Sequence, residues 1–370
     1  MDTPRTLTSL RDEIADVDRA LLELLRRRLD LAADVGRLKA EAALPVVVRD
    51  VEDRILTRAR SHAQACGVSE DVMAAIFQAI IRSSVERQHR VGVELRARRG
   101  LRVLVVGGAG AMGSWLRSFF EVIGHHVDIV DPALATTPAT AGRIASAVVP
   151  DDLSRWDAVV VSVPLGLTPA VLGDVLARRP PGLVVEIASI KDHVLPVLTR
   201  ARHEGLRVAA LHPMFGPGKS LYEPLTFVLA CLDEPADERA RLEPLLRHPY
   251  THVVAVPLGH HDRLMGWLLG LAHLTGMLFG AALSRSGLEP EELRACASTT
   301  FTRQAATALS VLSEDPDLYL DIQRLNPHRG DVYAAARQAL ADLTARVEAG
   351  DREGFREALT AARRAVGDEG

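Results

Sequence analysis

An apolar strand that runs directly into a glycine-rich turn constrains the fold of this chain most strongly. Residues 103–106 are all apolar, and after Gly107 they are followed by a Gly-x-Gly-x-x-Gly spacing made by Gly108, Gly110 and Gly113. In dinucleotide-binding folds the first glycine permits a tight turn, the second lets the backbone approach a pyrophosphate, and the third lets the next helix pack on the strand. A helix beginning at Ala111 and Met112 offers N–H groups to the phosphates. The pattern predicts a Rossmann-like α/β domain with a dinucleotide site.

Two further strands end where such a site needs them. The second expected strand, residues 127–131, ends in Asp131, about 20 residues after the glycine turn, where a carboxylate accepts both ribose hydroxyls. Asp131 therefore favours NAD over NADP. The next apolar strand ends in Ser162, Val163 and Pro164, which we also expect beside the cofactor because ligands bind at the carboxyl ends of parallel strands.

Composition limits the other possibilities. The 370 residues carry a formal net charge of −4 and are 48% hydrophobic, which is typical of a globular chain of two or three domains and argues against nucleic acid as a partner. The three cysteines, Cys66, Cys231 and Cys296, are too few and too scattered for a disulfide framework or a metal site. We therefore expect a reducing, cytoplasmic compartment and no metal.

One segment is long and apolar enough to cross a membrane. Residues 264–283 hold twenty positions without a formal charge. The segment carries His273 and four glycines, and a helix that is apolar all round also suits the core of a dimer. We therefore expect it to be buried and not to span a membrane.

About a hundred residues precede the glycine turn, and their pattern is helical. Apolar residues recur at three- and four-residue spacing over residues 7–40 and predict one long helix within a bundle. Arg28 leaves from the apolar face, and Lys39, eleven residues on, lies about 20° away around a helix of 3.6 residues per turn. Arg11 lies about 100° from Arg28 and is expected to serve a site completed by another protomer.

Polar side chains on the other helices of this region complete the pattern. Ser84 and Gln88 stand one turn apart above an apolar stripe, and Glu52 opens the intervening helix. A buried cation without a partner is costly. A small dianionic ligand would neutralise Arg28 and Lys39 better than the few carboxylates nearby.

These residues resemble a known family, the small all-helical chorismate mutases, over residues 5–92. The resemblance implies an intertwined dimer of three-helix chains. It also implies that Arg11, Arg28 and Lys39 hold the carboxylates and ether oxygen of chorismate, that Glu52 meets the C4 hydroxyl, and that Ser84 and Gln88 complete the pocket. The family usually has an arginine where this chain has Val51. Its loss implies a weaker mutase or a different substituent at C4.

Polar residues also follow the later strands of the α/β region. Ser189 follows the strand at 183–187, and His212 follows the strand at 208–211. An imidazole near a hydroxyl and a nicotinamide suits a base that takes a hydroxyl proton while hydride leaves the same carbon.

The glycine turn together with the sequence Leu211-His212-Pro-Met-Phe-Gly-Pro217 resembles prephenate dehydrogenase over residues 101 to about 345. The resemblance implies that His212 hydrogen-bonds the C4 hydroxyl, that Ser189 supports it, that Arg303 binds a substrate carboxylate, and that His273 lines the substrate pocket. It also implies a C-terminal helical part that forms a homodimer. Several fused relatives have an arginine where this chain has Ala272.

The expected fold is therefore multidomain, α and α/β. We expect an all-helical mutase domain at 1–95, a Rossmann-like NAD-binding domain at 101–256 and a helical substrate and dimerisation domain at 257–366. The two resemblances imply successive steps, from chorismate to prephenate and then, with NAD, to 4-hydroxyphenylpyruvate in tyrosine biosynthesis. Three alternatives stay open: the 4-amino-4-deoxy substrates, which Val51 favours, arogenate, and a degenerate mutase domain that acts as a sensor.

Overall fold

The computed structural model describes residues 6–42, 49–96, 100–136, 145–248 and 250–367. Its contacts divide the chain into two compact units. The first unit comprises residues 1–163, 171–187 and 201–255, and the second comprises residues 164–170, 188–200 and 256–370. Each is described by itself.

The chain begins with three helices of the first unit, α1 (Leu7–Glu41), α2 (Arg49–Ala63) and α3 (Glu70–Arg96), with the short turn η1 (Gln64–Cys66) after α2. Helix α3 packs against both α1 and α2. Ala32, Ala33 and Gly36 make the close approach of α1 to α3 possible, and a Cβ at Gly36 would lie 2.7 Å from the Cα of Gln88. The predicted long N-terminal helix is confirmed.

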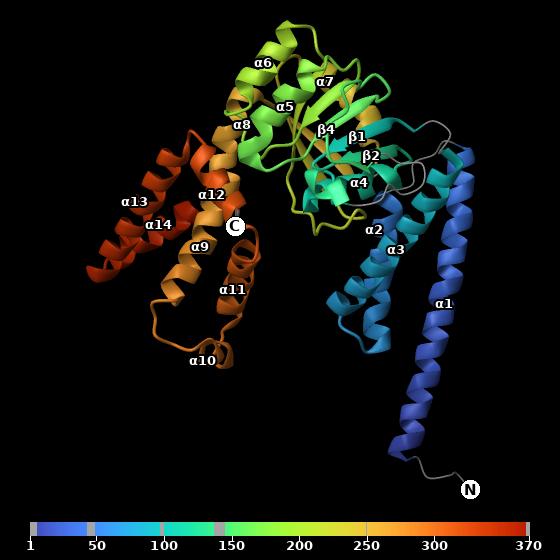
Figure 1. The fold of residues 1–370 in the computed structure, drawn as a ribbon. Coiled ribbons are helices and arrows are strands. Elements are labelled where there is room, and N and C mark those ends of the chain that lie inside the picture. Colours follow the sequence, from blue (N-terminus) through green and yellow to red (C-terminus); the bar gives the residue numbers. More distant parts are fainter. Residues whose placement is uncertain (1–5, 43–48, 97–99, 137–144, 249, 368–370) are drawn as a thin grey trace. The chain divides into compact units, whose positions relative to one another are not determined.

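The apolar stripe of α1 is exposed within one chain. Helix α1 continues well beyond the end of α2 and α3 (Figure 1). Leu7, Val17, Leu21 and Leu24 are each more than half exposed. Since apolar side chains in helical register normally face a core, this stripe is suited to cover by a second chain.

The α/β part contains an eight-stranded sheet in the order β3-β2-β1-β4-β5-β6-β7-β8. The strands are β1 (Arg102–Val106), β2 (His126–Val130), β3 (Ala145–Ser146), β4 (Ala158–Val161), β5 (Leu183–Glu186), β6 (Val208–Pro213), β7 (Leu225–Cys231) and β8 (Thr251–Pro257). Strands β1 to β6 are parallel, and β7 pairs with β6 in the antiparallel direction. The parallel strands have the Rossmann order, as predicted.

Helices α4 (Ala111–Val122), α5 (Thr168–Ala177), α6 (Leu195–His203) and α7 (Pro235–Leu246) connect the strands, with short turns η3 (Pro132–Thr136) and η4 (Leu165–Leu167). Helix α4 packs on β1 and β2. Its Trp115, Phe119 and Phe120 lie in the main apolar core with Val103 and Val105 of β1. Strands β4 and β5 are buried along their whole length. Their nearly continuous apolar sequences are typical of parallel strands covered on both faces.

The chain ends in helices α8 (Leu258–Met265), η5 (Gly266–Leu271), α9 (Ala272–Leu283), α10 (Pro290–Ala295), α11 (Thr299–Leu312), α12 (Pro316–Leu325), α13 (Arg329–Glu348) and α14 (Arg352–Ala365). The first three form one continuous helical segment, in which η5 is π-helical. Helix α11 packs against α9, and α12 and α13 pack against η5.

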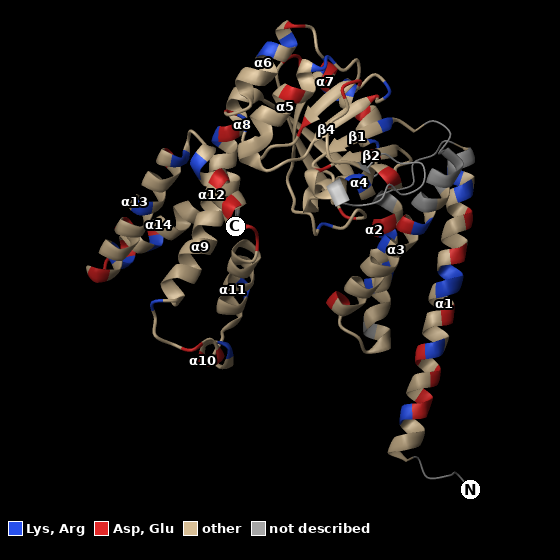
Figure 2. Cartoon of the chain, in the orientation of Figure 1, with Lys and Arg blue, Asp and Glu red and all other residues tan. Residues whose placement is uncertain are grey.

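The expected burial of residues 264–283 is not found within one chain. Leu258–Leu283 is long and apolar enough to cross a membrane, and only 22% of its most apolar window is buried. Trp267, Leu268 and Leu278 are each more than 40% exposed. Figure 2 shows no charged residue along α9. Within one chain the helix keeps an exposed apolar surface, so its burial in the core of a dimer stays a prediction.

Candidate active sites

In the glycine-rich turn, the individual glycines have different roles from those predicted. Gly107 adopts φ +87°, and its N–H donates to Val130 O at 2.7 Å. The positive φ of the tight turn therefore lies at Gly107 and not at Gly108. Gly108 is needed for another reason, since a Cβ there would lie 2.6 Å from the side chain of Ile129.

The other two glycines differ in the space around them. A Cβ at Gly113 would lie 2.1 Å from Gly107 O, so α4 packs on the turn too closely for any side chain. At Gly110 the closest atom would be 3.4 Å away, which is ordinary contact distance, so the turn is open on that side. Helix α4 begins at Ala111 with no side-chain cap on its N–H groups. An uncapped helix N-terminus beside an open glycine fits a pyrophosphate.

Asp131 and the end of β4 border the same turn. Asp131 directly follows β2, and its carboxylate accepts hydrogen bonds from Ala109 N at 3.1 Å and Ala133 N at 3.0 Å. Ser162 O would be 2.1 Å from a Cβ at Gly107, and Val163 lies beside it. Pro164 precedes η4 in the second unit. The Asp131 carboxylate, which can bind a ribose, the open turn and the helix N-terminus together fit a dinucleotide.

The sequence predicts that His212 follows its strand. In the structure His212 lies inside that strand, β6. Its strand continues to Pro213, because β7 pairs with residues 210–213, and His212 stands opposite Val228. Only 3% of His212 is exposed. The histidine is thus held by main-chain pairing on a buried strand of the first unit.

Ser189 belongs to the second unit, on the segment after β5, and is half-buried. This segment is fixed by a residue that the sequence patterns do not indicate. Asp262 of α8 accepts hydrogen bonds from Lys191 N at 2.8 Å, from Asp192 N at 2.7 Å and, at 2.7 Å, from His261 Nδ1. Burial would raise the pKa of Asp262, but these hydrogen bonds outweigh it and hold the pKa below its usual value.

His273 and Arg303 lie on the two packed helices α9 and α11. The imidazole of His273 lies 4.3 Å from the ring of Tyr319, centroid to centroid, and its Nδ1 is buried without a hydrogen-bond partner among the described residues. Burial lowers its pKa to about 4, so the ring is neutral at pH 7. Arg303 is exposed.

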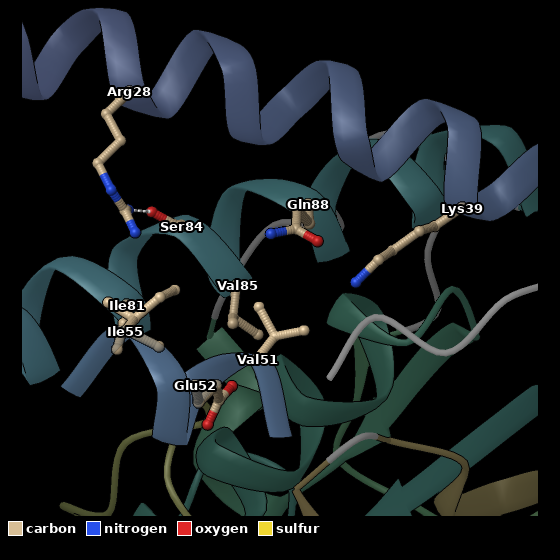
Figure 3. A pocket seen from close by; sticks show the side chains of 9 residues that line it. All are labelled: Arg28, Lys39, Val51, Glu52, Ile55, Ile81, Ser84, Val85 and Gln88. Atoms are coloured by element: carbon tan, nitrogen blue, oxygen red, sulfur yellow. Dashed lines mark hydrogen bonds between the residues drawn. The ribbon is translucent and has the colours of Figure 1, made fainter. Parts of the chain in front are cut away.

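The other candidate site is a pocket between the N-terminal helices (Figure 3). Its lining comes from all three helices and comprises Arg28, Lys39, Val51, Glu52, Ile55, Ile81, Ser84, Val85 and Gln88. Five of the six mutase residues predicted from the sequence are therefore brought together. The sixth, Arg11, is exposed on the first turns of α1 and does not line this pocket.

Hydrogen bonds orient one of the two pocket cations. Arg28 donates to Ile80 O at 3.2 Å and to Ser84 Oγ, and the Ser84 hydroxyl donates to Ile80 O at 2.9 Å. Lys39 and Gln88 point into the same space (Figure 3), and Gln88 Oε1 is buried without a hydrogen-bond partner among the described residues. Burial lowers the pKa of both Arg28 and Lys39, and Glu52 partly offsets the shift at Lys39. Partly buried cations favour an anionic ligand.

Family models match both ends of the chain. Chorismate mutase type II matches residues 10–89, and the dimerization domain of prephenate dehydrogenase matches residues 258–361. The T-protein of Enterobacter agglomerans is 28% identical over 94% of this chain and 90% of its own length. The T-protein of Haemophilus influenzae is 25% identical over 100% of this chain and 94% of its own length.

The chain is a T-protein-like fusion. It joins a chorismate mutase module to a prephenate dehydrogenase module. A solved prephenate dehydrogenase from A. aeolicus, in complex with hydroxyphenyl propionate and NAD+, has the same fold as the second module, with a TM-score of 0.58, 18% identity and coverage of 72% of this chain and 97% of that one. The name of the matched C-terminal family also gives a reason for the exposed apolar surface of α9.

Proposed function

We propose that this protein is a bifunctional enzyme of tyrosine biosynthesis. Its helical module rearranges chorismate to prephenate, and its second module oxidises prephenate with NAD to 4-hydroxyphenylpyruvate and carbon dioxide. The observation that carries this proposal is the pocket of Arg28, Lys39 and Glu52 in a chain whose two ends match the two enzyme families. The product of the first reaction is the substrate of the second.

In the mutase pocket no nucleophile is needed. Arg28 and Lys39 bind the carboxylates and the ether oxygen, and they stabilise the negative charge that develops on that oxygen as its bond to carbon breaks. Ser84 holds the Arg28 guanidinium in place. Glu52 contacts the C4 substituent, and Gln88 contacts a carboxylate of the substrate. Arg11, which is exposed in its own chain, reaches the pocket of a second protomer. Holding the compact conformer lowers the entropic barrier of the rearrangement.

In the dehydrogenase module His212 accepts the proton of the C4 hydroxyl, and Ser189 keeps the supporting role that the family resemblance implies for it. NAD, bound at the glycine turn and Asp131, supplies a hydride acceptor for the hydrogen on C4. The C4–O bond becomes a carbonyl, the bond to the ring carboxylate breaks, and its electrons enter the ring, which becomes a phenol. Arg303 binds the remaining side-chain carboxylate, and His273 lines the pocket.

A specific observation favours a second candidate substrate. Val51 lines the pocket next to Glu52 and is 40% exposed. A C4 ammonium would pair with Glu52, and at Val51 it meets no cation that would repel it. A relative named 4-amino-4-deoxyprephenate dehydrogenase, from Streptomyces pristinaespiralis, is 29% identical over 73% of this chain and 92% of its own length. The 4-amino-4-deoxy series is therefore the alternative for both steps.

One experiment tests both candidates. The purified chain is given chorismate or 4-amino-4-deoxychorismate with NAD, and the formation of NADH and of the aromatic product is followed. Turnover of chorismate at least about tenfold faster, which is about 1.4 kcal/mol in transition-state free energy, supports the first proposal, and the reverse ratio supports the second. No NADH from either substrate, or from prephenate or arogenate supplied directly, refutes the dehydrogenase assignment.

Val51→Arg sharpens this comparison, with Val51→Ile as the matched control. If Val51 sets the C4 specificity, the arginine variant shifts the ratio towards chorismate, and the isoleucine variant does not. We further propose a cytoplasmic homodimer, since the matched C-terminal family is a dimerization domain.

A further inference from the structure

The long apolar helix of the second unit contains a widened turn. Residues 266–271 (η5) are π-helical, between the α-helical segments α8 and α9. A π turn takes one residue more than an α turn and often marks a functional site. Because each residue of an α-helix advances the side chains by about 100°, the extra residue rotates every side chain of α9 by about that angle.

Two side chains from neighbouring helices hold this turn. Gln323 of α12 donates from Nε2 to Gly270 O at 3.0 Å, and its own Oε1 accepts a hydrogen bond from the Tyr333 hydroxyl of α13 at 2.8 Å. Gln323 is 8% exposed. A widened turn leaves a main-chain acceptor without its usual α-helical donor. The Gln323 amide supplies a donor to that segment, and Tyr333 orients the amide.

His273 is the second residue after the turn. Its ring packs against Tyr319 of α12, the helix that also carries Gln323. Its Nδ1 is buried and makes no hydrogen bond to the described residues. A rotation of α9 by about 100° would take His273 away from Tyr319. The direction of this imidazole therefore depends on the π turn.

We propose that Gln323 and Tyr333 are positioning residues of the dehydrogenase: they stabilise the π turn that directs His273, whose imidazole then contacts the substrate. This inference rests on the proposed function of the second module. Neither residue touches the substrate. Their effect passes through His273, and so it falls on substrate binding more than on NAD binding or on the mutase reaction.

The test uses Gln323→Met and Tyr333→Phe in the full-length protein. Gln338→Met is the matched control, because Gln338 of α13 is exposed and donates its hydrogen bond to Asp342 of the same helix, at 2.8 Å. Steady-state kinetics with prephenate and NAD give KM and kcat. The pKa of the His273 imidazole is followed by NMR, with His273→Gln to assign its signals.

We expect Gln323→Met to raise the KM for prephenate about tenfold and to move the pKa of His273 from about 4 back towards its usual value of 6.5. Tyr333→Phe should do the same to a smaller extent, and Gln338→Met should change neither. In a His273→Gln background, Gln323→Met should add little to KM, because two residues that act through one interaction are not additive.

A folded Gln323→Met variant with unchanged KM and unchanged His273 pKa overturns the proposal, as does an additive double variant. If Gln323→Met does not fold, Tyr333→Phe decides, since it removes only one hydroxyl. Absence of dehydrogenase activity in the unmodified protein would refute the proposed function, while the NMR measurement still decides whether Gln323 positions His273.

Discussion

His212 stands near the carboxyl end of the buried strand β6, and ligands of open α/β sheets bind beyond the carboxyl ends of the strands. Replacing it by Asn keeps a polar side chain of similar size but removes the base. We expect His212→Asn to lower the dehydrogenase kcat by about 10²- to 10⁴-fold, with unchanged mutase turnover and unchanged NAD affinity. His203→Asn, at an exposed position of α6, is the control. Dehydrogenase turnover within twofold of the unmodified protein would refute the role of His212 as the base.

His273 gives the protein a pH dependence whose direction follows from its environment. Its pKa falls from 6.5 in the unfolded chain to about 4 in the folded one, because burial disfavours the charged ring. Between these values the unfolded chain binds more protons, so stability present above pH 6.5 is lost as the pH falls towards 4. When the pH is lowered from 7 to 5, we expect the Tm of the His273→Gln variant to fall less than the Tm of the unmodified protein. Identical pH profiles would contradict the burial of this ring.

At the level of the strand–turn–helix element, Gly113 and Gly110 have separable roles. Gly113→Ala forces a Cβ to within 2.1 Å of Gly107 O, so α4 must shift on the turn. Such overpacking costs about 1–3 kcal/mol, and Tm should fall. Gly110→Ala meets no closer atom than 3.4 Å. Its Tm should change little, while its NAD affinity, measured by calorimetry, should fall about tenfold. A Gly110→Ala variant with normal NAD affinity would place the cofactor elsewhere.

The elements that sequence patterns predict are those fixed by local rules. The glycine spacing predicts the β1–α4 unit, and nearly continuous apolar sequences predict β4 and β5. The extension of β6 through His212 is not predicted, because it depends on antiparallel pairing with β7. The role of Asp262 is also missed, since its carboxylate is bound by N–H groups 70 and 71 residues away in the sequence. The positive φ at Gly107 depends on the path of the turn, which the glycine spacing does not specify.

For the whole molecule, the N-terminal pocket is expected to depend on two chains. Arg11 is exposed in its own chain, whereas Arg28 lines the pocket. We expect Arg11→Ala and Arg28→Ala each to lower mutase turnover strongly and to leave dehydrogenase turnover intact. Mixing the two variants after reversible dissociation should restore activity. Half of the dimers then contain one chain of each variant, and one of the two sites in such a dimer has both arginines, so we expect about a quarter of the unmodified turnover. If mixing restores nothing, Arg11 serves its own chain or no site.

The exposed apolar stripe of α1 and the exposed apolar surface of α9 lie near opposite ends of the sequence, and we expect each to be covered by a second copy of the chain. A chain with two self-complementary surfaces is bivalent. If both surfaces meet the same partner, the assembly closes at two chains, and if they meet different partners, it either closes into a larger ring or grows into an open filament. A mass of two chains that does not change with protein concentration would show closure, and the two exposed apolar surfaces would then be covered by one and the same partner.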